Sequence, residues 1–434
     1  MLVALLTGSF SFPATLPVVA ADTVPGALQS YVNRPEPDFA WEVVRRTETD
    51  NGRLLELRLT SQKWHDIVWE HAVEIFEPAK LEYPQHALLF VTGGNLPPQG
   101  PDQGTLQMGS FLTRHSGTRV VVLHQVPNQP LFDNRREDDL ITETWLKYLQ
   151  TGDETWPLLF PMVKSAVKTM DAVQQLSADE FDQRIEKFVI TGASKRGWTS
   201  WLTPVADSRV IATAPIVIDV LNFRAQMNHQ LETWGKFSDQ IIDYSSKGLI
   251  VTGDESPREE QLRLMMDPFT YRQQLTLPKL LVNGTNDPYW VCDAMKCYWP
   301  DLSGPRYALQ IPNAGHSLNG GKELALSAVA AFTRHMASGR PLPELDWIIT
   351  PDASSVRLQM TASAHPLAAR FWSAHSSDLD FRDERWSATP ITQHEDTWVG
   401  SVARNGTQHI ALYGEMQFKI DDVPYSLCTI IHRF

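Results

Sequence analysis

The sequence predicts an α/β protein with the α/β-hydrolase fold, and three observations carry this prediction. Continuous apolar runs, such as residues 86–91 and 119–123, lead into turns, which is typical of parallel strands buried on both faces. Amphipathic segments with helical spacing lie between such runs. Residues 188–198 join a β-branched run to an amphipathic segment through Gly192 and Ala193, which predicts a strand, a sharp turn and a helix. We therefore expect a mostly parallel central sheet covered by helices.

Length and composition indicate one large and one small domain. The chain has 434 residues, more than one core usually organises, and 42% of them are hydrophobic. The formal net charge of −13 disfavours nucleic acid as a partner. The three cysteines have no spacing suited to zinc, so free thiols are expected, and neither a metal nor another cofactor is predicted.

The first 21 residues predict a signal peptide, and hence a periplasmic or secreted protein. They are almost free of charge, and small residues precede Asp22, as at a cleavage site. The usual basic start is missing, so an ordinary frayed terminus is the alternative. No later segment has the roughly 18 uninterrupted apolar residues of a membrane span, so none is expected in the mature chain.

Residues 22–342 make up the predicted catalytic domain. Besides the strands above, the apolar pattern predicts two early strands at 53–60 and 72–76 and a further strand at 213–217. Helical spacing predicts two helices at 161–176 and 198–205. Residues 221–277 then interrupt the alternation with polar and aromatic helical material, which would lie over the strand ends as a cap and shape a pocket. The aromatic residues of this cap belong either to a core or to a platform for a sugar or peptide. The charged segment 133–139 predicts a solvated ion-pair face, with one charge facing the pocket as the alternative.

Residues 343–434 predict a separate β-sandwich. A helix at 322–338 ends at Gly339, and a proline-marked linker follows at 340–343. Short alternating runs then recur at 356–360, 368–374, 398–402, 410–418 and 425–431. This part holds no convincing catalytic set, and we expect it to be independent of the chemistry.

Ser194 stands on the predicted sharp turn, where its Oγ would project above the end of the sheet. The usual pattern is Gly-x-Ser-x-Gly, but Arg196 takes the place of the second glycine and Gly197 follows. Two later strands lead to Asp287 and His316. Serine, acid and histidine come in this chain order in α/β-hydrolases, so these three residues form the predicted catalytic triad.

One alternative concerns the acid, and another the cations of the turn. Asp219, at the end of an earlier strand, is the alternative acid and otherwise a structural carboxylate. The Lys195 and Arg196 side chains, which an ordinary elbow does not require, either bind an anionic group of the substrate or, for Arg196, pair with a carboxylate such as Asp219. The backbone N–H of Lys195 and one from the turn holding Gly94 and Asn95 are the predicted oxyanion donors. A plain strand-ending turn is the alternative for the glycines.

Residues 192–198, 283–290 and 312–316 resemble the PhoPQ-activated pathogenicity-related protein family, and similarity extends to 126–130, 214–222 and 380–382. The resemblance implies an α/β-hydrolase-like chain with a C-terminal β domain and leaves the substrate undefined.

The sequence therefore predicts a serine hydrolase that acts on an ester or amide bond of a small-molecule, peptide or carbohydrate-ester substrate. The alternative is a catalytically weak or inactive hydrolase scaffold that acts as a secreted binding, signalling or virulence-related protein. A metal-dependent hydrolase is disfavoured, because the sequence has no clustered ligand set.

Overall fold

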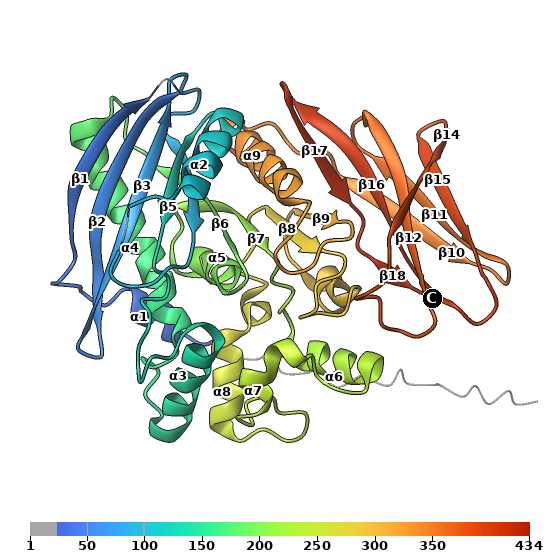
Figure 1. Cartoon of the computed structure of the whole chain (residues 1–434), viewed down its shortest axis with the longest axis horizontal. Helices are drawn as coiled ribbons and strands as arrows, with labels where there is room; N and C mark the ends of the chain where they lie inside the picture. The colour runs from blue at the N-terminus through green and yellow to red at the C-terminus, as the bar shows by residue number, and fades with distance from the viewer. Residues whose placement is uncertain (1–23, 50, 99) are drawn as a thin grey trace, which may run out of the picture.

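The computed structural model describes residues 24–49, 51–98 and 100–434, and a long mixed β-sheet runs through it (Figure 1). The predicted signal peptide lies outside these residues. The chain is an α/β protein in which strands of the central sheet alternate with helices along much of the sequence.

The middle of the sheet is parallel. Its neighbours follow the order β5-β4-β6-β7-β8-β9, and each pair is parallel. The bounds are β4 (His86–Val91), β5 (Arg119–Leu123), β6 (Lys187–Ala193), β7 (Val210–Ile216), β8 (Lys279–Gly284) and β9 (Arg306–Ile311). Because the carboxyl ends of parallel strands share one edge, the turns after β4, β6, β8 and β9 can meet there.

The expectation of a mostly parallel sheet is wrong for the sheet as a whole, because hairpin-connected strands extend both of its ends and such strands pair antiparallel. One end adds β1 (Ala40–Thr49), β2 (Gly52–Trp64) and β3 (Ile67–Pro78). The other end adds β17 (Val423–Cys428), β16 (His409–Ile420), β12 (Ala368–Ser376) and β13 (Ser387–Pro390), with β18 (His432–Arg433) beside β16.

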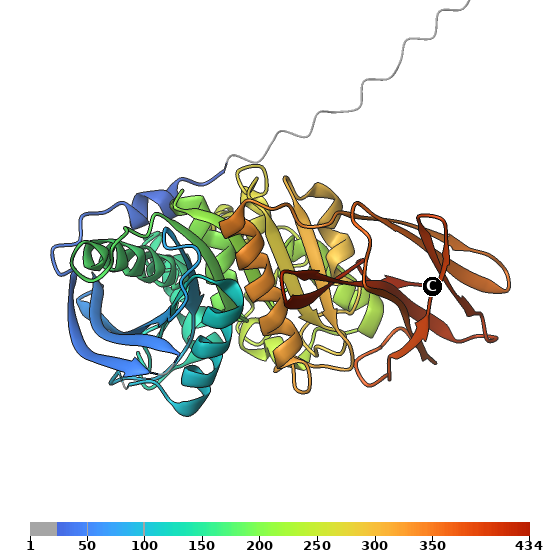
Figure 2. The ribbon, with the colours of Figure 1, turned by 90° about the horizontal axis from the view of Figure 1, so that it is seen from above.

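Helices cover both faces of the sheet. Alternate residues of the buried strands face two separate cores: Leu89 and Val121 pack in one with α4 and α5, and Leu88 and Val120 pack in the other with α2 and α9. Figure 2 shows the N-terminal strands curving around α4. The bounds are α1 (Ala27–Val32), α2 (Gln103–Ser116), α3 (Glu137–Thr151), α4 (Leu159–Glu180), α5 (Lys195–Ala206) and α9 (Lys322–Ser338).

The predicted cap corresponds to short helices between β7 and β8. They are α6 (Phe223–Trp234), η1 (Asp239–Ile241), α7 (Ile242–Ser245), α8 (Pro257–Met266) and η2 (Pro268–Tyr271). In Figure 1 helices α7 and α8 lie beside α3 and α6 lies beyond them, all below the sheet. Ser256 begins α8 with a capping box, which explains why a helix starts there. Two further turns, η3 (Ala294–Cys297) and η4 (Trp299–Asp301), follow β8. Across the described residues, no helix has the length and apolar character needed to cross a bilayer.

The C-terminal strands lie in two layers, but they are not detached from the rest. One layer is a second sheet, β10-β11-β15-β14, formed by β10 (Leu345–Pro351), β11 (Ser355–Ala362), β15 (Thr397–Ala403) and β14 (Thr392–His394). The other layer continues the central sheet, because Cys428 of β17 pairs with Ala308 of β9. The layers approach so closely that a Cβ at Gly400 would lie 2.5 Å from Phe371. The domain boundaries expected from the sequence stay a prediction.

Candidate active site

Ser194 occupies a strained turn between β6 and α5. Its φ of 56° and ψ of −126° lie outside the regions that residues with a Cβ normally adopt. A Cβ at Gly192 would lie 2.8 Å from the Arg196 backbone, and one at Gly197 would lie 2.6 Å from Ile218. Glycine is therefore needed at 197 rather than at 196, which explains the shifted spacing of this turn.

The structure brings Ser194, His316 and Asp287 together from three different strand ends. His316 Nε2 lies 2.9 Å from Ser194 Oγ, and His316 Nδ1 lies 2.8 Å from Asp287 Oδ2. Asp287 is buried, and its other oxygen accepts a hydrogen bond of 2.9 Å from the Tyr289 N–H. The Tyr289 ring also packs against the His316 ring, with centroids 4.2 Å apart. In this arrangement the histidine can accept a proton from the serine while the carboxylate orients the ring.

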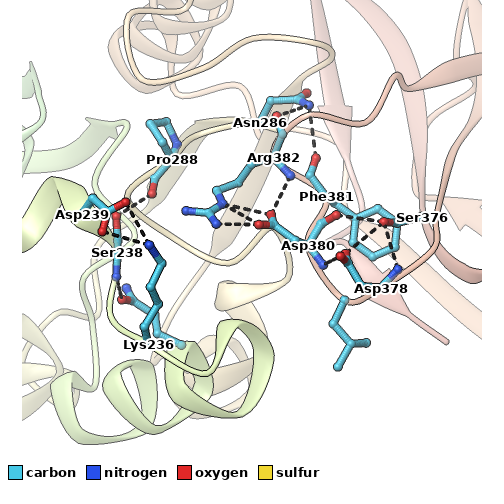
Figure 3. Close-up of polar contacts among 12 residues, drawn as sticks. Lys236, Ser238, Asp239, Asn286, Pro288, Ser376, Asp378, Asp380, Phe381 and Arg382 are labelled. Atoms are coloured by element: carbon cyan, nitrogen blue, oxygen red, sulfur yellow. Dashed lines mark hydrogen bonds and ion pairs between the residues drawn. The ribbon is translucent and has the colours of Figure 1, made fainter.

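The loops that carry Asp287 and His316 are both fastened to a C-terminal loop at 376–386. The Asn286 side-chain amide donates to the Phe381 and Arg382 carbonyl oxygens, at 3.2 and 2.9 Å (Figure 3). It also lies 2.7 Å from the Glu384 carbonyl oxygen. Asn313 exchanges two hydrogen bonds with the Trp386 backbone, at 3.0 and 2.8 Å. The C-terminal loop thus contacts the loops of both residues, while the expectation that the C-terminal part is independent of the chemistry stays a prediction.

Thr285 links the two loops to each other. Its Oγ1 accepts a hydrogen bond of 2.8 Å from the Asn313 N–H and donates one of 2.7 Å to Asn286 Oδ1. A continuous polar chain thus runs from the C-terminal loop through both asparagines, close to Asp287 and His316. Only the polar residues after β8 and β9 indicate this polar chain in the sequence, and local pattern does not identify their long-range partners.

The expected ion pair of Arg196 with Asp219 is wrong, because Arg196 reaches Glu137 at the start of α3. Its two terminal nitrogens lie 2.8 Å from the two Glu137 oxygens, and its Nε donates to the Val126 carbonyl. Lys195 Nζ lies 3.1 Å from Glu137 and 3.2 Å from Asp138. Arg196 and Lys195 are buried, at 9% and 7% exposure, and both are ion-paired, so a role in binding an anion of the substrate stays a prediction.

The carboxylate of Glu137 is held in its ionised form by these cations. Burial by itself would raise the pKa of Glu137, but the hydrogen bond from Arg196 and the charges of Arg196 and Lys195 outweigh it and lower the pKa to about 2. Gln129 donates a further hydrogen bond of 2.7 Å to the same carboxylate. The segment 133–139, expected mostly as a solvated face, therefore contributes a carboxylate that pairs with both cations of the turn.

Asp219 lies apart from Ser194 and His316 in the hydrogen-bond network, and it accepts a hydrogen bond from the Tyr298 hydroxyl. Burial raises its pKa to about 7, although the hydrogen bond from Tyr298 lowers it. Asp287 is therefore the carboxylate that pairs with His316, and Asp219 is a buried carboxyl nearby.

The predicted oxyanion residues fall into two groups. Lys195 begins α5, so its backbone N–H has no acceptor within the helix, and the residue borders the cavity described below. Gly94 and Asn95 lie outside the lining of that cavity. The Gly94 carbonyl accepts a hydrogen bond from Gln129, and the Asn95 side chain accepts one from Arg136. Their role as oxyanion donors stays a prediction.

A cavity of about 120 Å³ opens beside Ser194 and His316. The cap, α3 and the segment after Asp287 supply most of its wall, which is largely apolar and includes Trp145, Ile218, Phe223, Met227, Tyr244 and Trp290. Asp138 also lines it, as the alternative interpretation of segment 133–139 anticipated. Trp145, Tyr289 and Trp290 could not be assigned to the cavity from the sequence, because an aromatic residue in a helix or loop has the same pattern whether it faces a core or a cavity.

No arrangement suited to a metal ion occurs in the described residues: they contain no group of three or more His, Cys, Asp or Glu side chains placed to bind one. The three cysteines are free thiols.

Some solved structures resemble the chain. Acetyl xylan esterase 1 from Thermoanaerobacterium sp. JW/SL YS485 has a TM-score of 0.47 and 15% sequence identity, over 70% of this chain and 93% of that one. A puromycin-hydrolyzing peptidase from Mycobacterium tuberculosis has a TM-score of 0.42 and 14% identity, over 66% of this chain and 40% of that one. Likeness this distant says nothing about the substrate.

Two comparisons of sequence identify the family. Autocrine proliferation repressor protein A from Dictyostelium discoideum is 33% identical over 379 residues, which are 82% of this chain and 76% of that protein. The sequence model of the PhoPQ-activated pathogenicity-related protein family matches residues 28–382, which include Ser194, Asp287 and His316. The chain belongs to the PhoPQ-activated pathogenicity-related protein family.

Proposed function

We propose that the protein is a serine hydrolase that transfers the acyl group of an ester or amide to water. The observation that carries the proposal is the unbroken hydrogen-bonded series from Ser194 through His316 to Asp287, at 2.9 and 2.8 Å, beside a cavity. A serine on a strained turn, with a histidine and a buried carboxylate behind it, is the arrangement that activates a hydroxyl as a nucleophile.

In the proposed reaction His316 Nε2 takes the Ser194 proton while Oγ bonds to the substrate carbonyl carbon. The carbonyl oxygen becomes an oxyanion, which the backbone N–H of Lys195 and one from Gly94 or Asn95 would stabilise. His316 then gives the proton to the leaving alcohol or amine, and the bond to that group breaks. Water attacks the acyl-enzyme by the same route and releases a carboxylic acid, while Asp287 stabilises the histidine cation throughout.

The test is labelling by a fluorophosphonate probe together with hydrolysis of p-nitrophenyl acetate. The wild type should be labelled and active, whereas Ser194→Ala should lose labelling, and its kcat should fall on the order of 10⁴-fold or more because the three residues act as one unit. Ser200→Ala is the matched control, since Ser200 lies in the same helix and its hydroxyl donates to the Arg196 carbonyl. Equal labelling of the wild type and Ser194→Ala would refute the proposal.

The second candidate function is a signalling protein on a hydrolase scaffold. The relative in Dictyostelium is named as a repressor of proliferation, and that name does not state an enzymatic activity. A wild-type protein that resists the probe and hydrolyses no ester would favour this candidate. A periplasmic or secreted location is part of both proposals and rests on the charge-poor residues 1–21; fractionation of cells that produce the full chain would test it.

A further inference from the structure

We infer that the candidate active site selects substrates by a neutral, apolar group about the size of a benzene ring, bound in the cavity under the cap. This inference rests on the proposed hydrolase function for its reaction but not for its binding step. It names a substrate class distinct from sugar esters and from esters of anionic sugars or peptides.

The wall of the cavity is largely apolar. It includes Trp198 of α5, Val220 after β7, and Met227, Leu249 and Leu262 of the cap. Sites for sugars or carboxylates require several unpaired polar groups aimed at the ligand, because each buried hydroxyl or charge must be satisfied. A wall of this composition instead favours a group that loses little on leaving water.

The cations that line the cavity are paired with lining carboxylates. The lining includes three carboxylates and three cations, namely Asp138, Glu255, Glu259, Lys195, Arg224 and Arg263. Lys195 pairs with Asp138 at 3.2 Å, Arg224 with Glu255 at 3.3 Å and Arg263 with Glu255 at 2.9 Å. Each lining cation therefore already has a carboxylate partner within the described residues. An anionic substrate group would compete with these carboxylates for the same cations, whereas a neutral group would not.

The size of the cavity suits a small apolar group. The cavity measures about 120 Å³, and an apolar protein cavity of about 150 Å³ accommodates benzene. The space therefore suits one aromatic ring or a short branched chain. Because it adjoins Ser194 and His316, the bound group must lie next to the scissile bond, on its acyl side or on its alcohol or amine side.

The experiment compares kcat/KM in two ester series. The acyl series consists of p-nitrophenyl acetate, phenylacetate and hemisuccinate; the alcohol series consists of methyl, benzyl and methyl-xyloside acetates. In at least one of the two series, kcat/KM for the phenyl compound should exceed that for the small neutral compound by roughly 10- to 100-fold. This range corresponds to the free energy of burying an aromatic side chain. The hemisuccinate should be no better than the acetate. A preference for the hemisuccinate or the xyloside acetate over the phenyl compound would overturn the inference.

Variants connect this preference to the cavity. Met227→Glu places a charge on a half-buried part of the wall and should lower the phenyl-to-small ratio at least tenfold. Leu249→Glu, at a second half-buried lining position, tests the same point if the first variant fails to fold. Ile242→Glu is the matched control, because Ile242 is 58% exposed and lies outside the lining. An equal ratio in the wild type and every folded lining variant would contradict the inference.

Binding without turnover separates this inference from the proposed function. In Ser194→Ala, 4-nitrotoluene should quench the fluorescence of the lining tryptophans, and adding Met227→Glu should weaken its binding at least tenfold. If no ester is hydrolysed but this binding occurs, the hydrolase proposal fails and the cavity inference stands. If esters are hydrolysed but 4-nitrotoluene binds equally with and without Met227→Glu, the cavity inference fails and the hydrolase proposal stands.

Discussion

The cap and the C-terminal strands both adjoin the candidate site, but they contribute different things to it. Cap residues such as Phe223 and Met227 line the cavity beside Ser194. Among the described residues, those after His316 contribute nothing to the lining. The C-terminal loop at 376–386 instead accepts hydrogen bonds from Asn286 and Asn313, next to Asp287 and His316.

The difference suggests a division of labour. A wall that touches the substrate determines which substrate is bound, whereas a polar chain behind the reacting groups determines their geometry. The two regions also meet at the loop of the acid: Ser238 of the cap donates to the Pro288 carbonyl at 2.7 Å, on the other side of Asp287 from Asn286 (Figure 3). Changes in the two regions should therefore have separable effects on kinetics.

The largest effect on kcat should come from breaking the contact between the C-terminal loop and the loop that carries Asp287. Asn286→Ala removes the amide that binds the 376–386 loop, and a small displacement of Asp287 then misaligns His316. We expect kcat to fall about 100-fold, because a misplacement of about 1 Å has this effect on rate. KM should change by less than threefold, since the cavity wall is untouched.

A urea-unfolding curve distinguishes positioning from a general loss of stability. If Asn286 positions Asp287 and His316, kcat per folded molecule should fall in Asn286→Ala, whereas a loss of stability alone would lower only the folded fraction. Asp383→Ala is the matched control, since Asp383 is exposed on the same C-terminal loop. A variant with normal kcat and raised KM would show that the C-terminal loop acts on substrate binding instead.

Local pattern predicted much of the fold and of the site, but long-range partners were beyond it. Buried apolar runs and the Gly-Ala-Ser turn indicate β6, α5 and the chain order of the three site residues, because each depends on neighbours in sequence. β1 was missed, since Glu42, Arg45 and Arg46 reduce its apolar alternation. The predicted partner of Arg196, Asp219, was wrong, because the ion pair forms with Glu137. Both residues are carboxylates in segments that follow strands, and only tertiary packing distinguishes them.

A second prediction concerns Asp219, which precedes the cap and accepts a hydrogen bond from Tyr298. The pKa of Asp219 is raised to about 7 by burial, so the unfolded chain loses this proton first as pH rises and the folded state becomes relatively less stable. Between pH 5 and 6.5 the free energy of unfolding should fall by about 2 kcal/mol through this group. Asp219→Asn, measured by urea unfolding, should abolish that part of the pH dependence. Asp301→Asn, at an exposed carboxylate, should retain it.

A third, smaller effect should follow from changing Glu137, which joins α3 to the serine turn. Glu137→Gln leaves Lys195 and Arg196 with less compensating charge, and we expect a loss of roughly 1–2 kcal/mol at pH 7, since the carboxylate is partly exposed. The pKa of Glu137 is lowered to about 2, so its contribution is present above its ordinary pKa and is lost as pH falls. The difference from the wild type should therefore shrink below about pH 4. Asp133→Asn, at an exposed carboxylate of the segment 133–139, should leave the free energy of unfolding unchanged.

The smallest effect should arise where the cap and the C-terminal loop touch directly. The Arg382 guanidinium lies 4.0 Å from the centre of the Trp234 ring, at the end of α6, and this cation–π contact is partly exposed. Such contacts contribute about 0.5–1 kcal/mol. Because Arg382 also pairs with Asp380, a single variant would mix two effects, and a double-mutant cycle with Arg382→Gln and Trp234→Leu is needed to isolate the contact. We expect a coupling energy of about 0.5–1 kcal/mol in urea unfolding and faster hydrogen exchange in α6 for each single variant. A coupling energy of zero would mean that the cap and the C-terminal loop act independently at this contact. They would then be connected through Arg433, which donates to the Thr233 hydroxyl and to the Leu379 carbonyl, and through Ser238 and Asn286 at the loop that carries Asp287.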